Sequence, residues 1–295
     1  MKLNKILKNY NIKPIGYEKN GKIIIIKTTN NSFVYKEGKL NNQIFDYLKS
    51  RNYEYFPHFL NNINEEYQLT QYIDSLSIPD EQKIIDLIKT VALLHSKTTH
   101  YKEIDLDYYE KIYEDLNNNI NYLYTYYTDI ITIIESKVYM SPSQYLFARN
   151  ISIIYKTLNQ NKEKLDNWYN HIKEKTKERR VIIHNNLALS HFIISDKPYL
   201  TSWDKAKIAS PVFDLYKLYL NHALDFDFET IIKTYEKHYP LLEDEKELFY
   251  ILITQPILID FKLPEYQNCK KINKMINIII KANELSKHNL KNTKT

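Results

Sequence analysis

Side chains that can do chemistry are concentrated in one stretch of the second half of the chain. His184, Asn186 and His191 lie at its start, and Asp204 and Asp214 follow. A histidine pair can bind a metal ion, but His184 and His191 do not have the i,i+4 spacing of one helix face. No cysteine lies close to them in the sequence. We therefore do not interpret the two histidines as a metal pair.

The first quarter of the chain has the pattern of a small antiparallel sheet. Asn20-Gly21 separates two extended segments, 14–18 and 22–28, and Asn-Gly is the strongest short signal for a hairpin turn. Residues 32–36 are expected as a third strand. Residues 40–50 follow as a helix with its apolar residues on one face. This pattern predicts a sheet with one helix.

The rest of the chain has the periodicity of helices, with one interruption. Residues 179–204 are expected to be mostly extended, because this stretch has apolar runs without a helical period. Ser141 and Pro142 are expected to begin a helix, since serine caps helices and proline suits the first helical position. We expect helices over residues 80–95, about 105–137, about 142–178 and from 212 onward.

Three motifs in and after the interruption resemble those of one enzyme superfamily. Residues 181–194 read V-I-I-H-N-N-L-A-L-S-H-F-I-I. This resembles the catalytic loop of the aminoglycoside phosphotransferase and choline kinase superfamily, in which H-G-D-x-x-x-x-N stands between apolar pairs. Residues 199–206, Y-L-T-S-W-D-K-A, resemble the metal-binding strand L-I-D-W-D/E-x-A of that superfamily. Residues 210–215, S-P-V-F-D-L, resemble its D-P-x-x-D-L-A motif.

The N-terminal part agrees with this resemblance. Lys36 stands where the superfamily's nucleotide-pairing lysine ends the third strand, and Leu93-Leu94-His95 resembles its L-x-x-L-H helix end. The added helix pair and the His-Asn-Asn sequence look most like the bacterial spore-coat kinase-like (CotS-type) branch. The resemblance implies a bilobal, protein-kinase-like α+β fold. It would have a small antiparallel-sheet lobe at 1–75 and a mainly helical lobe at 76–295, with an added long helix pair and a degenerate catalytic loop at 181–206.

The resemblance also implies which groups phosphoryl transfer would use, and three of them are replaced. Asn186 stands at the position of the catalytic base, and a side-chain amide does not take up a proton near neutral pH. Ser202 stands where a carboxylate would hold magnesium, and a neutral hydroxyl is a poor substitute for an anionic oxygen. His191 stands at the metal-amide position, and its nitrogen suits zinc or copper better than magnesium. We therefore expect ordinary magnesium–ATP chemistry to be impaired.

Asp204 is the main argument for retained activity. It follows Ser202 by two residues, so on a strand it would point to the same side but lie about 6–7 Å away. That distance is too long for the same ion unless the loop is rebuilt. Lys36 has an alternative interpretation as a solvent-facing strand lysine, since the helix expected at 40–50 offers no glutamate to align it.

Several of these residues also have structural interpretations. The resemblance implies that Asp214 supports the catalytic loop by accepting hydrogen bonds from its backbone. His184 is expected to pack and form hydrogen bonds within the same loop. Trp203 is expected in the core, and His95 as a satisfied histidine at a helix end. The tyrosines of residues 122–127 are expected to pack rather than to line a groove.

Composition narrows the class of protein. Hydrophobic residues make up 43% and charged residues 26%, which is ordinary globular usage. A net charge of +5 is too small to indicate nucleic-acid binding, and the single cysteine, Cys269, excludes a disulfide framework. Three glycines are too few for a glycine-rich phosphate loop. No apolar run approaches the roughly 20 residues of a membrane span. We expect a cytoplasmic protein with no nucleic-acid or membrane partner.

Three functional hypotheses remain open. The first is a pseudokinase that requires no cofactor. It would bind an unknown protein partner or small metabolite through the cleft that holds the nucleotide in active members of the superfamily, or through the helix pair. The second is an active but divergent phosphotransferase for a small hydroxylated or aminated metabolite, using ATP and magnesium held by Asp204. The third is a structural, spore-coat-type component of an assembly, located at the spore if the organism forms one; it rests on the branch resemblance alone.

Overall fold

The structure, a computed structural model, describes residues 2–61, 66–105 and 107–292. Packing divides the chain into two compact units, each made of two segments. The first unit comprises Met1–Thr99 and Val181–Ala209, and the second comprises His100–Arg180 and Ser210–Thr295. This division cuts the chain at other points than the lobes 1–75 and 76–295, which stay a prediction.

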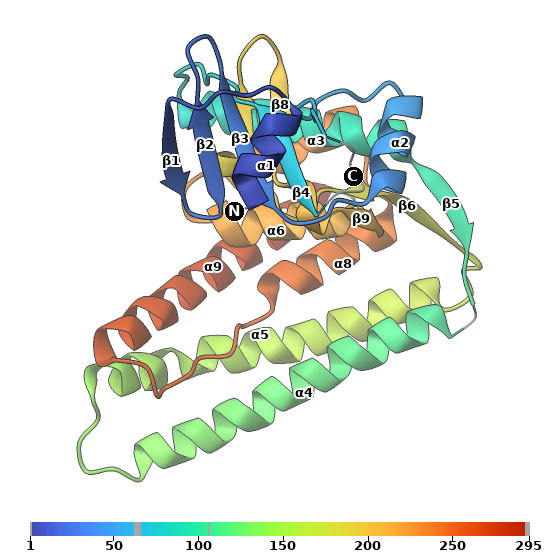
Figure 1. Ribbon diagram of the computed structural model, residues 1–295. Coiled ribbons are helices and arrows are strands. Elements are labelled where there is room, and N and C mark those ends of the chain that lie inside the picture. The colour runs from blue at the N-terminus through green and yellow to red at the C-terminus, as the bar shows by residue number, and fades with distance from the viewer. Residues whose placement is uncertain (1, 62–65, 106, 293–295) are drawn as a thin grey trace. The chain divides into compact units, whose positions relative to one another are not determined.

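The first unit contains a four-stranded antiparallel sheet in the order β1-β2-β3-β4 (Figure 1). Asn20 pairs with Ile23 across the first turn, where Gly21 has a φ of 56°. Glycine adopts this left-handed conformation without steric cost, so the hairpin predicted at Asn20-Gly21 is confirmed. The strands are β1 (Gly16–Asn20), β2 (Ile23–Lys27), β3 (Ser32–Glu37) and β4 (Tyr67–Gln71).

A helix that the sequence pattern did not predict precedes this sheet. α1 (Lys2–Asn9) buries Leu7 in a cluster with Ile26 and Leu69 of the sheet, and Leu3 and Ile6 pack against the same cluster. The expectation of a sheet with only one helix is therefore wrong. Leu3, Ile6 and Leu7 have the i, i+3, i+4 spacing of one helix face, but the lysines and asparagines between them hide the pattern in so short a segment.

Two further helices complete the helical part of the first unit. In α2 (Asn42–Ser50), the Asn41 side chain accepts a hydrogen bond from the backbone N–H of Gln43 at 3.1 Å and caps the helix. α3 (Asp80–Thr98) begins at the expected residue and continues past His95 to Thr98. His95 is fully buried in it, in agreement with the expected structural histidine.

Short strands and turns replace the helical pattern between residues 177 and 209. β6 (Lys177–Ile183) begins soon after the preceding helix ends at Ile172, so the expectation of a helix as far as residue 178 is wrong. Its last three residues pair with β9 (Lys207–Ala209), and β7 (Phe192–Ile194) forms a hairpin with β8 (Pro198–Leu200). Two single 3₁₀ turns, Leu189–His191 and Trp203–Lys205, complete this segment.

The second unit is built around a long antiparallel helix pair, α4 (Tyr108–Glu135) and α5 (Pro142–Ile172) (Figure 1). Ser141 and Gln144 form a reciprocal capping box at the start of α5, with Pro142 in its first turn, as predicted. β5 (His100–Glu103) pairs with the first residues of β6. The remaining helices are α6 (Val212–His222), α7 (Phe228–His238), α8 (Glu243–Thr254) and α9 (Glu265–Asn292).

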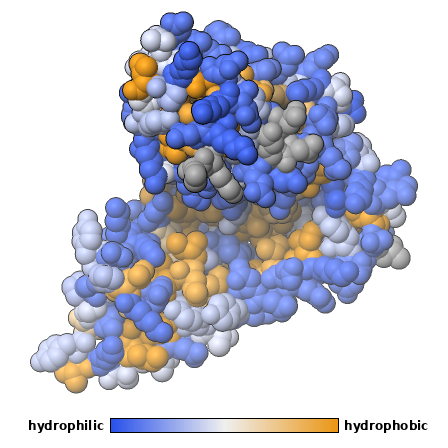
Figure 2. Space-filling view, viewed as in Figure 1, coloured by the Kyte–Doolittle hydropathy of each residue, from blue (hydrophilic) through white to orange (hydrophobic). Residues whose placement is uncertain are grey.

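The turn between α4 and α5 exposes apolar side chains. Val138 is 88% exposed and Tyr139 is 87% exposed, and Ile133 and Met140 are also exposed. Figure 2 shows hydrophobic residues gathered over this end of the helix pair. Within the described residues, no helix combines the length and the apolar character that crossing a bilayer requires.

Candidate functional site

The candidate site of the first unit contains a cluster of three side chains, Lys36, Gln68 and Asp204, which we call the Lys36 cluster. Lys36 lies near the end of β3, directly opposite Gln68 of β4. Its ammonium forms an ion pair with the Asp204 carboxylate. The Lys36 side chain is only 16% exposed, so it is not the solvent-facing lysine of the alternative interpretation. Asp204 is thus the carboxylate partner of Lys36, and α2 has no glutamate to take that place.

Asp204 has a donor on each of its carboxylate oxygens. Lys36 donates to Oδ2, and the Gln68 amide donates to Oδ1 at 2.8 Å. Gln68 also approaches the carbonyl oxygen of Gly38 at 3.3 Å. Burial raises the pKa of Asp204, but the hydrogen bonds from Lys36 and Gln68 and the positive charge of Lys36 outweigh burial and hold that pKa below its usual value. Asp204 is therefore ionised and occupied at neutral pH.

A tight turn, not a strand, brings Asp204 to Lys36. Ser202 has φ 62° and ψ 51°, a left-handed conformation that serine adopts at a cost, and Trp203–Lys205 form a 3₁₀ turn. The expectation that Ser202 and Asp204 share the same side of one strand is therefore wrong, because β8 has already ended at Leu200.

Trp203 anchors this turn. It is 3% exposed, and its ring packs edge-on against Phe45, Tyr53 and Phe56 of the same unit. Its indole N–H donates to the carbonyl of Leu200 at 2.7 Å. The expectation of Trp203 in the core is confirmed. Since one neighbour of Trp203 in the chain is Ser202 and the other is Asp204, this burial fixes both.

The predicted catalytic loop is held together by its own polar groups. His184 is fully buried and its Nε2 lies 2.8 Å from the carbonyl oxygen of Thr201. A carbonyl only accepts, so this nitrogen carries the proton. The same ring packs edge-on against Trp203, with 4.9 Å between ring centroids. The predicted packing role of His184 agrees with these contacts.

The replaced base and metal positions also bond within the loop. The Nδ1 of His191 donates to the backbone carbonyl of Asn186 at 2.8 Å. The Asn186 amide approaches the carbonyl of Ser202 at 3.5 Å, and Asn185, with a φ of 56°, donates to the carbonyl of Lys205 at 3.2 Å. The structure thus brings Asn186, His191 and Ser202 together through contacts with backbone carbonyls, and their assignment as base and metal positions stays a prediction.

Asp214 belongs to the second unit. It is fully buried in the first turn of α6. Its implied support of the catalytic loop through hydrogen bonds stays a prediction.

These residues do not fit a resident magnesium ion. Magnesium prefers several oxygen ligands in a near-octahedral set. Of the residues brought together here, Asp204 alone has a carboxylate; each of its oxygens accepts one hydrogen bond, from Lys36 or Gln68, and His191 offers nitrogen. Across the described ranges, no group of three or more His, Cys, Asp or Glu residues could hold a metal ion.

Two features of the site could not be predicted from the sequence. Gln68 carries no motif, and only the β3–β4 register places it opposite Lys36. The contact between Lys36 and Asp204 joins residues far apart in the chain through an irregular turn.

The tyrosines of residues 122–127 divide into packing residues and surface residues. Tyr126 and Tyr127 donate to the carbonyls of the 257–259 segment, whereas Tyr122 and Tyr124 are exposed.

Comparison with known proteins identifies the fold. No protein-family model matches the chain, and no curated sequence matches it. An aminoglycoside phosphotransferase from Alicyclobacillus acidocaldarius superposes with a TM-score of 0.70 at 9% identity, over 94% of this chain and 92% of that one. The AMP-bound spectinomycin phosphotransferase APH(9)-Ia has a TM-score of 0.60 at 13% identity, over 95% and 97%.

The choline kinase LicA from Streptococcus pneumoniae has a TM-score of 0.50 at 16% identity, over 96% of this chain and 98% of that one. Identities this low show the fold alone. The chain has the kinase-like fold of the aminoglycoside phosphotransferases and choline kinases, and the predicted fold is confirmed.

Proposed function

We propose that this protein is a pseudokinase: a kinase-fold protein with impaired phosphoryl transfer that acts by binding a small metabolite or a protein partner. The observation that carries the proposal is the occupation of both carboxylate oxygens of Asp204 by Lys36 and Gln68. The two charged groups that could serve a nucleotide and its metal ion neutralise each other instead.

The base position supports the same conclusion. The Asn186 amide has no lone pair basic enough to take the proton of an attacking hydroxyl, and its N–H group faces the carbonyl of Ser202. Loss of a general base slows a reaction by about 10²- to 10⁴-fold. Since effects of residues that act together are not additive, we do not sum this loss with that of the metal carboxylate.

A second candidate is a divergent, active phosphotransferase in which Asp204 holds the metal ion. One observation favours it: Asp204 is an ionised carboxylate in direct contact with Lys36, the lysine placed where the superfamily pairs the nucleotide. A metal–nucleotide complex would then have to separate the ion pair, taking phosphate to Lys36 and metal to Asp204. In that case the acceptor would be a small hydroxylated or aminated metabolite, as the names of the structural neighbours suggest.

A third candidate is a structural component of an assembly, of the spore-coat type. It rests on the resemblance to the spore-coat branch. The exposed Val138 and Tyr139 at the end of the helix pair would provide an apolar contact surface for a protein. In all three cases, we propose a cytoplasmic or spore-associated protein whose partner is neither nucleic acid nor membrane.

A thermal-shift titration with ATP, with and without Mg²⁺ or Mn²⁺, tests the proposal. A ligand that binds the folded state raises the melting temperature. We expect the metal ions to add nothing to any effect of ATP. A metal-dependent increase that disappears in Asp204→Ala, together with transfer of phosphate from ATP to any acceptor, would overturn the proposal in favour of the active enzyme.

Lys36→Ala separates the remaining outcomes, with Lys27→Ala as the matched control. Lys27 lies on the neighbouring strand β2, and its partner is Glu18 rather than Asp204. Stabilisation by ATP alone that disappears only in Lys36→Ala assigns ligand binding to the cleft that holds the nucleotide in active members of the superfamily. The absence of any response to ATP excludes nucleotide binding and leaves another metabolite or a protein partner as the ligand.

A further inference from the structure

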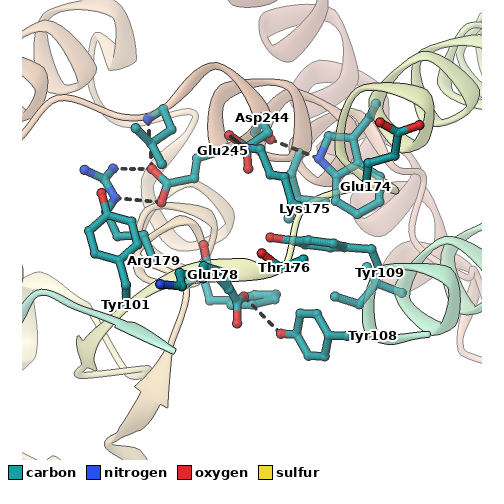
Figure 3. Close-up of a pocket in the computed structure, with 17 residues that line it drawn as sticks. Tyr101, Tyr108, Tyr109, Glu174, Lys175, Thr176, Glu178, Arg179, Asp244 and Glu245 are labelled. Carbon is teal, nitrogen blue, oxygen red and sulfur yellow. Dashed lines mark hydrogen bonds and ion pairs between the residues drawn. The ribbon is translucent and has the colours of Figure 1, made fainter. Parts of the chain in front are cut away.

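The second unit contains a cavity of about 470 Å³ whose lining includes no residue of the Lys36 cluster. All its lining residues belong to that unit, at the starts of α4, β6 and α8 and near the end of α5 (Figure 3). Its apolar walls are mainly aromatic: Tyr101, Tyr108, Tyr109, Trp168 and Phe213. We call it the Tyr109 cavity. A volume of this size suits a small organic molecule.

The buried acidic groups on its walls form ion pairs within the protein. Glu245 accepts from Arg179, with 2.9 Å to its Nε, and Asp244 pairs with Lys175 at 2.7 Å. The third acid, Glu178, pairs with Arg180 and also accepts from the Tyr108 hydroxyl at 2.9 Å.

The remaining charged lining residues, Glu174 and Lys177, are exposed and opposite in sign. Each buried lining carboxylate therefore has its own cation. A charged ligand would lose its hydration without meeting an unpaired counter-charge.

Tyr109 places a hydroxyl without a partner among the described residues at the wall of the cavity. Its side chain is 6% exposed, and its hydroxyl forms no hydrogen bond with any described residue. In Figure 3 this hydroxyl points toward the cavity, away from α4. Burial raises the pKa of Tyr109, and the negative charges of Glu178 and Asp244 raise it further, so the hydroxyl keeps its proton. It is available as a donor to something inside the cavity.

We propose that the Tyr109 cavity binds an uncharged small molecule that has an apolar ring and an oxygen acceptor. The aromatic walls would contact the ring. The Tyr109 hydroxyl would donate to the oxygen, completing a hydrogen bond that the protein does not supply. The three internal ion pairs exclude ions of either sign. This site does not involve the Lys36 cluster, so the result of its test does not depend on whether the pseudokinase proposal is correct.

Three probes of equal shape and different charge test this proposal: benzyl alcohol, benzylammonium and benzoate. The chain has two tryptophans, so the ¹⁵N-labelled full-length protein has two indole N–H signals. Trp168 lines the cavity and donates to the carbonyl of Asp244 at 3.0 Å, whereas Trp203 lies in the first unit. We expect benzyl alcohol to shift the Trp168 signal saturably and to leave the Trp203 signal in place.

The charged probes decide the ligand class. We expect benzylammonium and benzoate to bind at least tenfold more weakly than the alcohol, because neither finds a free counter-charge. Equal or tighter binding of either ion overturns the proposed class. No shift of Trp168 with benzyl alcohol up to its solubility limit overturns the site.

Tyr109→Phe tests the donor, with Tyr113→Phe as the matched control on the same helix. The Tyr113 hydroxyl is already bonded to Asp166 at 2.8 Å and does not line the cavity. We expect Tyr109→Phe to weaken benzyl alcohol binding by about three- to tenfold, the worth of one hydrogen bond, and Tyr113→Phe to leave it unchanged. Unchanged binding in Tyr109→Phe contradicts the role of the hydroxyl.

Discussion

The Lys36 cluster of the first unit and the Tyr109 cavity of the second unit differ in whether their polar groups have hydrogen-bond partners within the protein. In the cluster, Asp204 has a protein donor on each carboxylate oxygen. In the cavity, the buried acidic residues also form ion pairs, but the Tyr109 hydroxyl has no partner among the described residues and faces a volume of about 470 Å³. The polar groups of the Lys36 cluster are therefore satisfied within the protein, whereas the Tyr109 hydroxyl is left for a molecule in the cavity.

The difference shows that residue type alone does not identify a binding site. Lys36 and Asp204 are the residues from which a phosphate and metal site would be built, yet their mutual contact uses the charges that a ligand would need. Tyr109 has an ordinary side chain, but its hydroxyl has no hydrogen-bond partner among the described residues and can donate to a molecule inside the cavity. Hydrogen-bond satisfaction therefore separates the two regions more clearly than composition does.

The largest expected effect concerns the anchor of the Lys36 cluster. Trp203→Ala removes a buried ring that packs against Phe45 and fixes the turn carrying Asp204. We expect it to lower the free energy of unfolding by about 3–5 kcal/mol, measured by urea denaturation. Tyr139→Ala, at an exposed position, is the control and should change stability by less than about 0.5 kcal/mol. A loss in Trp203→Ala no larger than the control would contradict the anchoring role.

The second-largest expected effect is the restoration of a metal-binding site. Asn186→Asp combined with Ser202→Asp returns both missing carboxylates, and aspartate tolerates the left-handed backbone at position 202. We expect metal-dependent stabilisation by ATP, about 2.7 kcal/mol at a ligand concentration 100 times Kd. Asn186→Asp with Ser202→Asn keeps the shape without the second charge and should not respond to the metal. A folded double variant that ignores magnesium–ATP would count against the assignment of these positions.

A smaller, pH-dependent effect measures the contact between Asp204 and Lys36. The pKa of Asp204 is lowered in the folded state, so the pair stabilises the protein above the unfolded pKa of about 3.9. That contribution is lost as the pH falls toward the folded-state pKa. Asp204→Asn should therefore cost about 1 kcal/mol at neutral pH, since the pair is partly exposed, and nothing in strong acid. Asp196 is the control, because its carboxylate accepts from the neutral Tyr199 hydroxyl at 2.9 Å, so the cost of Asp196→Asn should not follow the loss of an ion pair. An equal cost of Asp204→Asn at every pH would show that charge is not the reason.

Local patterns predicted much of the fold. The Asn20-Gly21 hairpin and the Ser141-Pro142 helix start each depend on residues next to one another in the chain, where turn and cap preferences act directly. α1 was missed because eight residues carry too few periodic apolar positions. Asn186, His191 and Ser202, which the motifs single out, lie close together through contacts with backbone carbonyls, and their functional roles stay a prediction.

The irregular and long-range features of both regions could not be read from the sequence. Nothing in the residue type of Ser202 predicts a positive φ, which glycine and asparagine favour, yet this turn decides where Asp204 goes. Gln68 reaches Asp204 only through strand register and that turn. The Tyr109 cavity forms between segments near residues 109, 168, 178 and 244, whose spacing in the chain follows no pattern.

The smallest effect tests the comparison at its most sensitive point, the unsatisfied hydroxyl. Tyr109→Phe removes an oxygen that forms no hydrogen bond with the described residues, so we expect the free energy of unfolding to stay within about 0.5 kcal/mol of the wild type. Tyr113→Phe breaks a hydrogen bond to Asp166 and should cost about 1 kcal/mol. Urea denaturation of both variants without ligand gives the comparison. If Tyr109→Phe costs as much as Tyr113→Phe, the hydroxyl is already satisfied, as the polar groups of the Lys36 cluster are.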